Sequence, residues 1–192
     1  MVDIRLCLVT SNEHKYREIK AIGEELGVEV DMCTAPKLEV QSDSLEEVAY
    51  KSALLAYLYL NRPLMVEDAG LYIKALNGFP GPYSNYVFKT IGLAGILKLM
   101  NGVEDRRACF KSAVAVVLDN YTFISTGEVC GYIADSPRGT RGFGFDPIFI
   151  PEGETRTFGE MSIEEKNRYS HRAVAVKKAL TRVIQLKSDT GL

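Results

Sequence analysis

Two adjacent acids stand in a stretch that otherwise has the composition of a buried β-strand. The stretch runs from Leu64 to Ile73 as LMVEDAGLYI, and its charged residues are Glu67 and Asp68. Neighbouring side chains on a strand point to opposite faces, so both acids cannot face water if one face is core. A metal ion or a lysine would remove the cost of burying a carboxylate. A bulge at Gly70 would turn both acids outward, and a strand end with two solvated acids is the structural alternative.

The segment Thr10–Lys15, TSNEHK, links a predicted strand to a predicted helix. The first N–H groups of a helix lack partners within the helix and carry partial positive charge. Small polar residues followed by the charge of Lys15 therefore make a plausible phosphate cradle. The segment lacks the Gly-x4-Gly-Lys pattern of a P-loop. The alternative interpretation is a plain helix cap with a solvated lysine.

A glycine-rich loop carries two aromatic residues and an acid. Phe143, Gly144, Phe145 and Asp146 lie within RGFGFDPIF. Two loop aromatics beside an aspartate are suited to stack on a flat heterocycle and to hydrogen-bond it. A small core tucked under the loop is the equally weighted alternative.

A basic cluster stands where the last predicted helix begins. Lys166, His171 and Arg172 lie within EEKNRYSHR, and Ser170 is placed to cap the helix. Cations in the first turn oppose the helix dipole, so the cluster calls for an anion or a polar ligand. A solvated basic face is the alternative.

Glu39, in KLEVQS, gains interest only if it approaches Asp68, because two carboxylates with phosphate oxygens and water can hold Mg²⁺.

Strand and helix patterns alternate along the chain. Helix periodicity with Ile19, Ile22 and Leu26 on one face ends at Gly27, and Ser44 with Glu47 predicts a capping box. A second box is predicted at Ser162 and Glu165, and a half-exposed strand or extended loop at residues 35–44. Predicted strands lie at 4–9, 28–33, 64–73, 108–120, 121–134 and 148–151, and helices at about 14–26, 45–60, 90–100 and 170–186, with 187–192 frayed. The order favours an α/β fold with a mixed sheet.

Composition and charge narrow the class of protein. The 192 residues suit one domain or two closely joined lobes, and a net charge of −2 gives no sign of a nucleic-acid surface. The four cysteines form no CxxC pair and two histidines accompany them, so a zinc site is not expected. Buried reduced thiols are favoured, with a disulfide left open. No leader and no apolar run of about 18 residues is present, which predicts a soluble cytoplasmic protein without a membrane partner.

Taken together, the segments TSNEHK, LEVQS, VEDAGL, GFPGPYS, RGFGFDPIF, FGEM and EEKNRYSHR resemble the inosine triphosphate pyrophosphatase family. The resemblance implies an elongated two-lobed α/β fold with a central mixed sheet flanked by helices and an active-site cleft between the lobes. It implies Mg²⁺-assisted attack of water on ITP, dITP and XTP, giving the monophosphate and pyrophosphate and so cleansing the nucleotide pool. It also implies a homodimer.

The resemblance assigns roles to matching residues. Glu39 and Asp68 would hold Mg²⁺, Asp68 would accept a proton from the attacking water, and Glu67 and Lys51 are possible contributors. The substrate-binding residues implied are Thr10, Ser11, Asn12, Glu13, His14, Lys15, Ala69, Phe143, Gly144, Phe145, Asp146, Lys166, His171 and Arg172.

Two positions depart from the family pattern. Ala69 stands where many members have serine, and Asn85 where some have a basic residue. Three other functions stay open on the sequence. They are a nucleotide-binding module without hydrolysis, a septum-inhibitor-like pyrophosphatase acting on other modified nucleotides, and a protein-interaction module.

Overall fold

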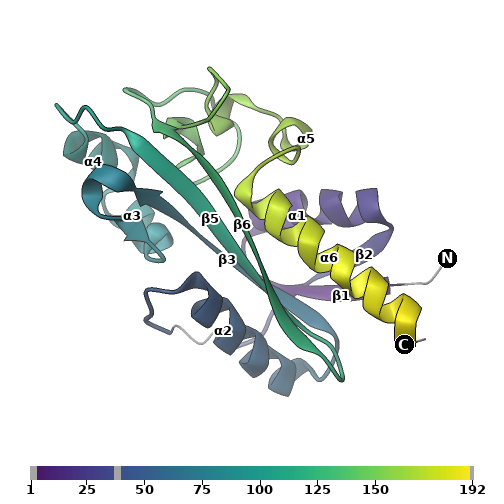
Figure 1. Ribbon diagram of the computed structural model, residues 1–192. Helices are drawn as coiled ribbons and strands as arrows, with labels where there is room; N and C mark the ends of the chain where they lie inside the picture. The colour runs from purple at the N-terminus through teal and green to yellow at the C-terminus, as the bar shows by residue number, and fades with distance from the viewer. Residues whose placement is uncertain (1–3, 37–39, 191–192) are drawn as a thin grey trace.

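The computed structural model describes residues 4–36 and 40–190 and shows a mixed α/β architecture (Figure 1). Among these residues, a seven-stranded sheet has the order β2-β1-β3-β5-β6-β7, and β4 pairs with β3. β1, β2 and β3 are parallel, and the remaining pairings are antiparallel. The strands are β1 Ile4–Val9, β2 Val28–Cys33, β3 Leu64–Ile73, β4 Pro80–Gly81, β5 Arg107–Val117, β6 Thr122–Ile133 and β7 Phe149–Pro151.

Helices cover both faces of the sheet. α1 and α6 pack on one face and α2 on the other, as Figure 1 shows. The α-helices are α1 Glu13–Leu26, α2 Leu45–Leu60, α3 Ser84–Thr90, α4 Gly92–Leu99, α5 Ile163–Lys166 and α6 His171–Thr190. Short 3₁₀ turns span η1 Lys74–Leu76, η2 Asp146–Ile148 and η3 Phe158–Glu160. The predicted mixed α/β fold is confirmed, and the cleft between two lobes stays a prediction.

Local sequence signals fix where most helices begin and end. The Asn12 side chain accepts hydrogen bonds from the backbone N–H groups of His14 and Lys15, and Gly27 ends α1 in the left-handed region, with φ of 70°. The Ser162–Glu165 capping box is confirmed, and it begins α5. Ser170 caps α6 by accepting from the N–H of Ala173.

Two boundary predictions are wrong. Ser44 caps α2, but the Glu47 carboxylate does not complete the box, because it accepts hydrogen bonds from Ser42 and Lys51 instead. Residues 187–190, expected to fray, continue α6 to Thr190. The half-exposed strand or extended loop predicted over 35–44 lies partly outside the described residues, and its described part forms no strand.

The core consists of three clusters of buried apolar side chains. One lies between the sheet and α1 and α6, and includes Ile19, Met65 and Val176. A second, on the same face of β3 and β5, joins α3, α4 and the loops before α6. The third packs α2 on the opposite face of the sheet. The first two clusters therefore share one sheet face, and the polar site described below lies between them.

The glycine at position 70 does not bulge the strand. β3 stays in continuous register with β5, Glu67 opposite Val114 and Asp68 opposite Ala113, so the predicted outward turn of both acids is wrong. A Cβ at position 70 would lie 2.2 Å from the carbonyl oxygen of Gly81. Gly70 is therefore needed for the close approach of β4.

The prediction of reduced cysteines is also wrong. Cys7 is bonded to Cys33, and Cys109 to Cys130. The cause is strand register, because β1 pairs with β2, and Cys109 lies directly opposite Cys130 in the β5–β6 pair. Spacing along the chain does not reveal such a register.

Substituting Gly70 by alanine tests the close approach of β4. The added methyl group meets backbone, which cannot move aside cheaply, so we expect the free energy of unfolding to fall by about 1–3 kcal/mol. Urea denaturation followed by circular dichroism measures the change. A variant as stable as the wild type would contradict the packing of β4 on β3.

Candidate active site

The site lies at the end of β1, where the chain adds the next strand on one side of β1 and the following strand on its other side. The chain passes from β1 through α1 to β2, and returns through α2 to β3 on the other side of β1. In open α/β sheets the crevice beyond the carboxyl ends of such strands is the usual place for a ligand. Thr10–Lys15, which follows β1, begins at this crevice. The sheet therefore positions the predicted phosphate cradle.

An unpaired length of strand edge explains the acidic pair. β1 pairs with β3 through Cys7–Leu64 and Leu8–Met65 and ends at Val9. β4 pairs with β3 only at Leu71 and Tyr72. Between these pairings, no described strand adjoins the β1 side of β3, and the Lys15 ammonium donates to the carbonyl oxygen of Glu67, at 3.2 Å. Because this edge is open, groups on both faces of β3 can border one site.

Glu67 is the buried centre of the cationic side of the site. Its carboxylate lies 2.9 Å from Lys15 Nζ and 3.1 Å from Arg172 Nε, and it accepts a hydrogen bond from Ser112 at 2.7 Å. Burial opposes ionisation, but Arg172 and Lys15 outweigh it and lower the pKa of Glu67 to about 2. The alternative of two solvated acids is wrong for Glu67, which is 7% exposed.

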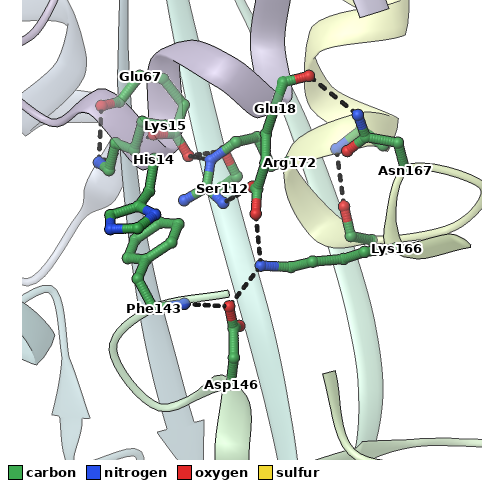
Figure 2. Close-up of polar contacts among 12 residues, drawn as sticks. His14, Lys15, Glu18, Glu67, Ser112, Phe143, Asp146, Lys166, Asn167 and Arg172 are labelled. Carbon is green, nitrogen blue, oxygen red and sulfur yellow. Dashed lines mark hydrogen bonds and ion pairs between the residues drawn. The ribbon is translucent and has the colours of Figure 1, made fainter. Parts of the chain in front are cut away.

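Ion pairs continue from Glu67 in alternating sign (Figure 2). Arg172 also pairs with Glu18, and the ammonium of Lys166 lies 2.7 Å from both Glu18 and Asp146. Burial raises the pKa of Asp146, whereas Arg172 and Lys166 lower the pKa of Glu18 despite its burial. Lys166 and Arg172 are each 2% exposed. The solvated basic face considered from the sequence is therefore wrong.

His171 lies among aromatic rings beside this chain of charges. Its ring stacks on Phe110 at a centroid distance of 4.6 Å and lies 6.5 Å from Phe158. Burial and the nearby Arg172 and Lys166 lower its pKa well below the usual value, so the imidazole is neutral. Its Nδ1 atom is buried and, within the described part of the chain, has no hydrogen-bond partner.

The two aromatics of the glycine-rich loop have different environments. Phe145 is 3% exposed and belongs to the second core cluster, as the small-core alternative held, and it packs edge-on against the exposed Phe88. Phe143 is half-buried and stacks on His14, with a centroid distance of 5.4 Å. The Phe143 backbone N–H donates to Asp146 at 2.8 Å, which ties the loop to Lys166.

A cavity adjoins the charged chain. Its volume is about 330 Å³, which lies at the lower end of the range of small-molecule sites. It is lined by Glu18, Arg141, Gly142, Met161, Ser162, Ile163, Glu164 and Lys166. A flat polar ligand lying there would meet the charges of Glu18 and Lys166.

Asp68 points to the opposite face of β3, the one that α2 covers. It is half-buried and shares this face with Tyr72. Burial, Glu46, Asp68 and Asp43 together raise the pKa of Tyr72 to about 12, which shows that carboxylates gather there. Glu39 lies outside the described residues.

The other possible contributors are placed as follows. Lys51, on α2, pairs with Glu47 at the surface, at 2.5 Å. Ala69, one residue past Asp68, lies opposite Ser112 of β5. Among the described residues, the side chains grouped closely enough to hold a metal are Cys109, Glu128 and Cys130, and their two sulfurs are already bonded to each other.

Sequence reasoning missed Glu18 and Ser112. Glu18 occupies a buried position of α1 beside Ile19 and Ile22, and an acid on an apolar helix face was the available signal. The Ser112 hydroxyl reaches Glu67 only through the pairing of β3 with β5, which no local pattern reveals.

The fold and site define an α/β protein that combines a predicted anion cradle, an acidic strand edge and an adjoining polar pocket. The sequence profile of the Ham1 family matches residues 6–182, and the chain belongs to that family. It is 54% identical over 172 residues to a dITP/XTP pyrophosphatase of Hyperthermus butylicus, covering 90% of each chain. It is 51% identical to the Saccharolobus solfataricus protein of the same name, covering 91% of each.

Solved structures agree with this family assignment. A HAM1 protein from Coxiella burnetii superposes with a TM-score of 0.83 at 28% identity, covering 95% of this chain and 99% of the other. The Staphylococcus aureus Ham1 protein gives a TM-score of 0.79 at 28% identity, with the same coverage. Within the described residues, no helix has the length and apolar character needed to cross a membrane.

Replacing Glu67 by glutamine tests its role as a counter-charge. Above pH 4.5 the ionised Glu67 contributes fully to stability, and this contribution is lost as pH falls through its native pKa of about 2. We expect Glu67→Gln to lower the free energy of unfolding at pH 7 by about 3–5 kcal/mol. The difference from wild type should shrink as pH falls from 4.5 towards 2.

Urea titrations at several pH values measure this difference. The matched control is Glu29→Gln, which removes an exposed ion pair to Arg5 and should change stability by less than about 1 kcal/mol. An equal effect of the two substitutions, or a Glu67→Gln difference that does not vary with pH, would contradict the assigned role.

Proposed function

We propose that this protein hydrolyses non-canonical purine nucleoside triphosphates, namely ITP, dITP and XTP, to the monophosphate and pyrophosphate. The observation that carries the proposal is the match to relatives named dITP/XTP pyrophosphatase across 90% of both chains. The site geometry supports it, because the anion cradle, the acidic edge and the pocket adjoin one another. Such an enzyme would remove damaged nucleotides from the pool.

The triphosphate is proposed to bind at the start of α1. The first backbone N–H groups of the helix and the Lys15 ammonium supply positive charge there. Two of those N–H groups, of His14 and Lys15, are already used by the Asn12 cap. Lys15 is paired with Glu67, so binding would transfer its ammonium from a carboxylate to a phosphate without leaving a charge unpaired.

Mg²⁺ is proposed as the cofactor, held by Asp68 together with Glu39 and phosphate oxygens. The half-buried Asp68 carboxylate and the acids gathered around Tyr72 are the hard oxygen ligands that Mg²⁺ prefers. The bound ion would neutralise developing charge and acidify a water. We assign to Asp68 the roles of orienting that water and accepting its proton. Lys51 and Glu47 stand on the neighbouring helix and can adjust the charge around the site.

The base is proposed to lie between Phe143 and the cavity beside Glu18 and Lys166. Hypoxanthine and xanthine carry an oxygen at C6, which accepts hydrogen bonds from Lys166, Arg172 or a backbone N–H. Adenine carries an amine there and would leave a buried donor unpaired, which rejects it strongly. The carboxylates of Glu18 and Asp146 fix the direction of these donors.

We also propose a cytoplasmic homodimer. The nucleotide pool is cytoplasmic, and the exposed aromatic residues Phe79, Tyr83, Tyr86 and Phe88, on and beside α3, offer apolar surface to a second copy. No nucleic-acid or membrane partner is proposed.

Assays with a panel of triphosphates test the reaction. We expect Mg²⁺-dependent pyrophosphate release from ITP, dITP and XTP and far slower release from ATP. Asp68→Asn should lower turnover by about 10²-fold or more, because the general base is lost. Binding of ITP without any pyrophosphate release would favour the nucleotide-binding module instead, and a preference for other modified nucleotides would favour the septum-inhibitor-like activity.

Arg172→Lys tests base recognition more cleanly than alanine would, because alanine would leave Glu18 and Glu67 without a buried counter-charge. Lysine keeps the charge but loses the planar donor geometry. We expect kcat/KM to fall by about 10-fold or more with ITP and XTP and less with ATP. A uniform loss across all bases would contradict base recognition by Arg172.

A further inference from the structure

The Phe143 ring contacts three side chains in the structure. The His14 imidazole stacks on it with an interplanar angle of 20°. Lys166 Nζ lies 5.1 Å and the Arg172 guanidinium carbon 5.2 Å from the ring centroid. Figure 2 shows the ring between the imidazole and the Lys166 ammonium. A base that takes the stacked position of the imidazole on Phe143 must therefore displace His14.

His14 is the group that can move. Lys166 and Arg172 are each 2% exposed and held by the buried carboxylates of Glu18, Asp146 and Glu67. The His14 side chain is exposed. Its backbone N–H, which donates to Asn12 at 3.0 Å, stays in place if only the side chain turns away. Displacing His14 therefore breaks no ion pair and leaves the helix cap intact.

We propose that the imidazole of His14 occupies the position that the substrate base takes on Phe143, so that His14 is an internal competitor that sets the affinity for nucleotides. An imidazole is a flat nitrogen heterocycle, like the five-membered ring of a purine. The inference rests on the proposed function, since it assumes that the base stacks on Phe143.

The neighbouring residue shows the same relation on the phosphate side. Lys15, next to His14 in the chain, is held by the Glu67 carboxylate, which a phosphate is proposed to replace as its partner. In the free site, two neighbouring residues of α1 are thus engaged with groups of the protein itself, Lys15 with a carboxylate and His14 with an aromatic ring. His14 and Lys15 both belong to one short segment at the start of α1.

Competition of this kind has a distinctive thermodynamic consequence. When His14 is stacked on Phe143, a base cannot bind there. The apparent affinity for a nucleotide is therefore the intrinsic affinity multiplied by the fraction of molecules in which His14 has turned away, and this fraction is the same for every base. Removing the imidazole should therefore strengthen binding of all base-carrying ligands by one factor. From the usual strength of an aromatic pair this factor is about 2- to 10-fold. A ligand without a base should be unaffected.

Calorimetric binding of IMP and of inorganic pyrophosphate tests the proposal, because neither ligand contains the bond between α- and β-phosphates of a nucleotide. His14→Ala should lower the Kd of IMP and of XMP by the same factor and leave the Kd of pyrophosphate unchanged. His14→Phe retains a stacking ring, so its Kd for IMP should be no lower than that of wild type. Arg17→Ala, an exposed residue of the same helix, is the matched control and should change neither.

Weaker binding of IMP by His14→Ala would overturn the proposal, since it would show that His14 contributes to substrate binding. Unchanged IMP binding, different factors for IMP and XMP, or an equal gain for pyrophosphate would overturn it too. Failure of the proposed function is separate, because it would appear as a wild-type protein that releases no pyrophosphate from ITP.

Discussion

The buried carboxylate of Glu67 holds the site together. It lies on the central strand and joins Lys15 of the helix start, Ser112 of β5 and Arg172 at the beginning of α6. A buried ion pair is a weak source of net stability, but losing one partner leaves an uncompensated charge. The start of α1, β5 and the start of α6 are therefore each held against β3 through Glu67. A charged partner can leave Glu67 without cost only if it gains another partner of opposite charge. A triphosphate is the proposed new partner for Lys15.

The open edge of β3 explains how two opposed side chains can serve one reaction. Glu67 faces the helices α1 and α6, and Asp68 faces α2. Beyond the last β1 pairing, the edge is approached by Lys15 rather than by a described strand. A ligand at this edge can meet the cations on one face and the acids on the other. In the proposed mechanism, charge neutralisation and water activation therefore take place on opposite faces of the same strand.

Local patterns in the sequence predicted those features that local physics determines. The end of α1 at Gly27, the long strand pair and the capping box at Ser162 follow from residues close in the chain. So does the cap at the start of α1, which the sequence offered only as the alternative to a phosphate cradle. The cysteine pairs, the partner of Glu67 and the need for Gly70 depend on register between strands, which no single segment encodes. Glu18 was overlooked because its partners come from residues about 150 positions away. The segments of the site were recognised, but the pairing of their charges was not.

Glu67 stays ionised in the buried site because Arg172 and Lys15 outweigh the cost of burial. Carbon-13 NMR titration of the labelled glutamate side chains measures its pKa directly, with Glu67→Gln identifying the resonance. We expect a Glu67 pKa of about 2, well below the usual 4.5. A Glu67 carboxylate that titrates at or above 4.5 would contradict it.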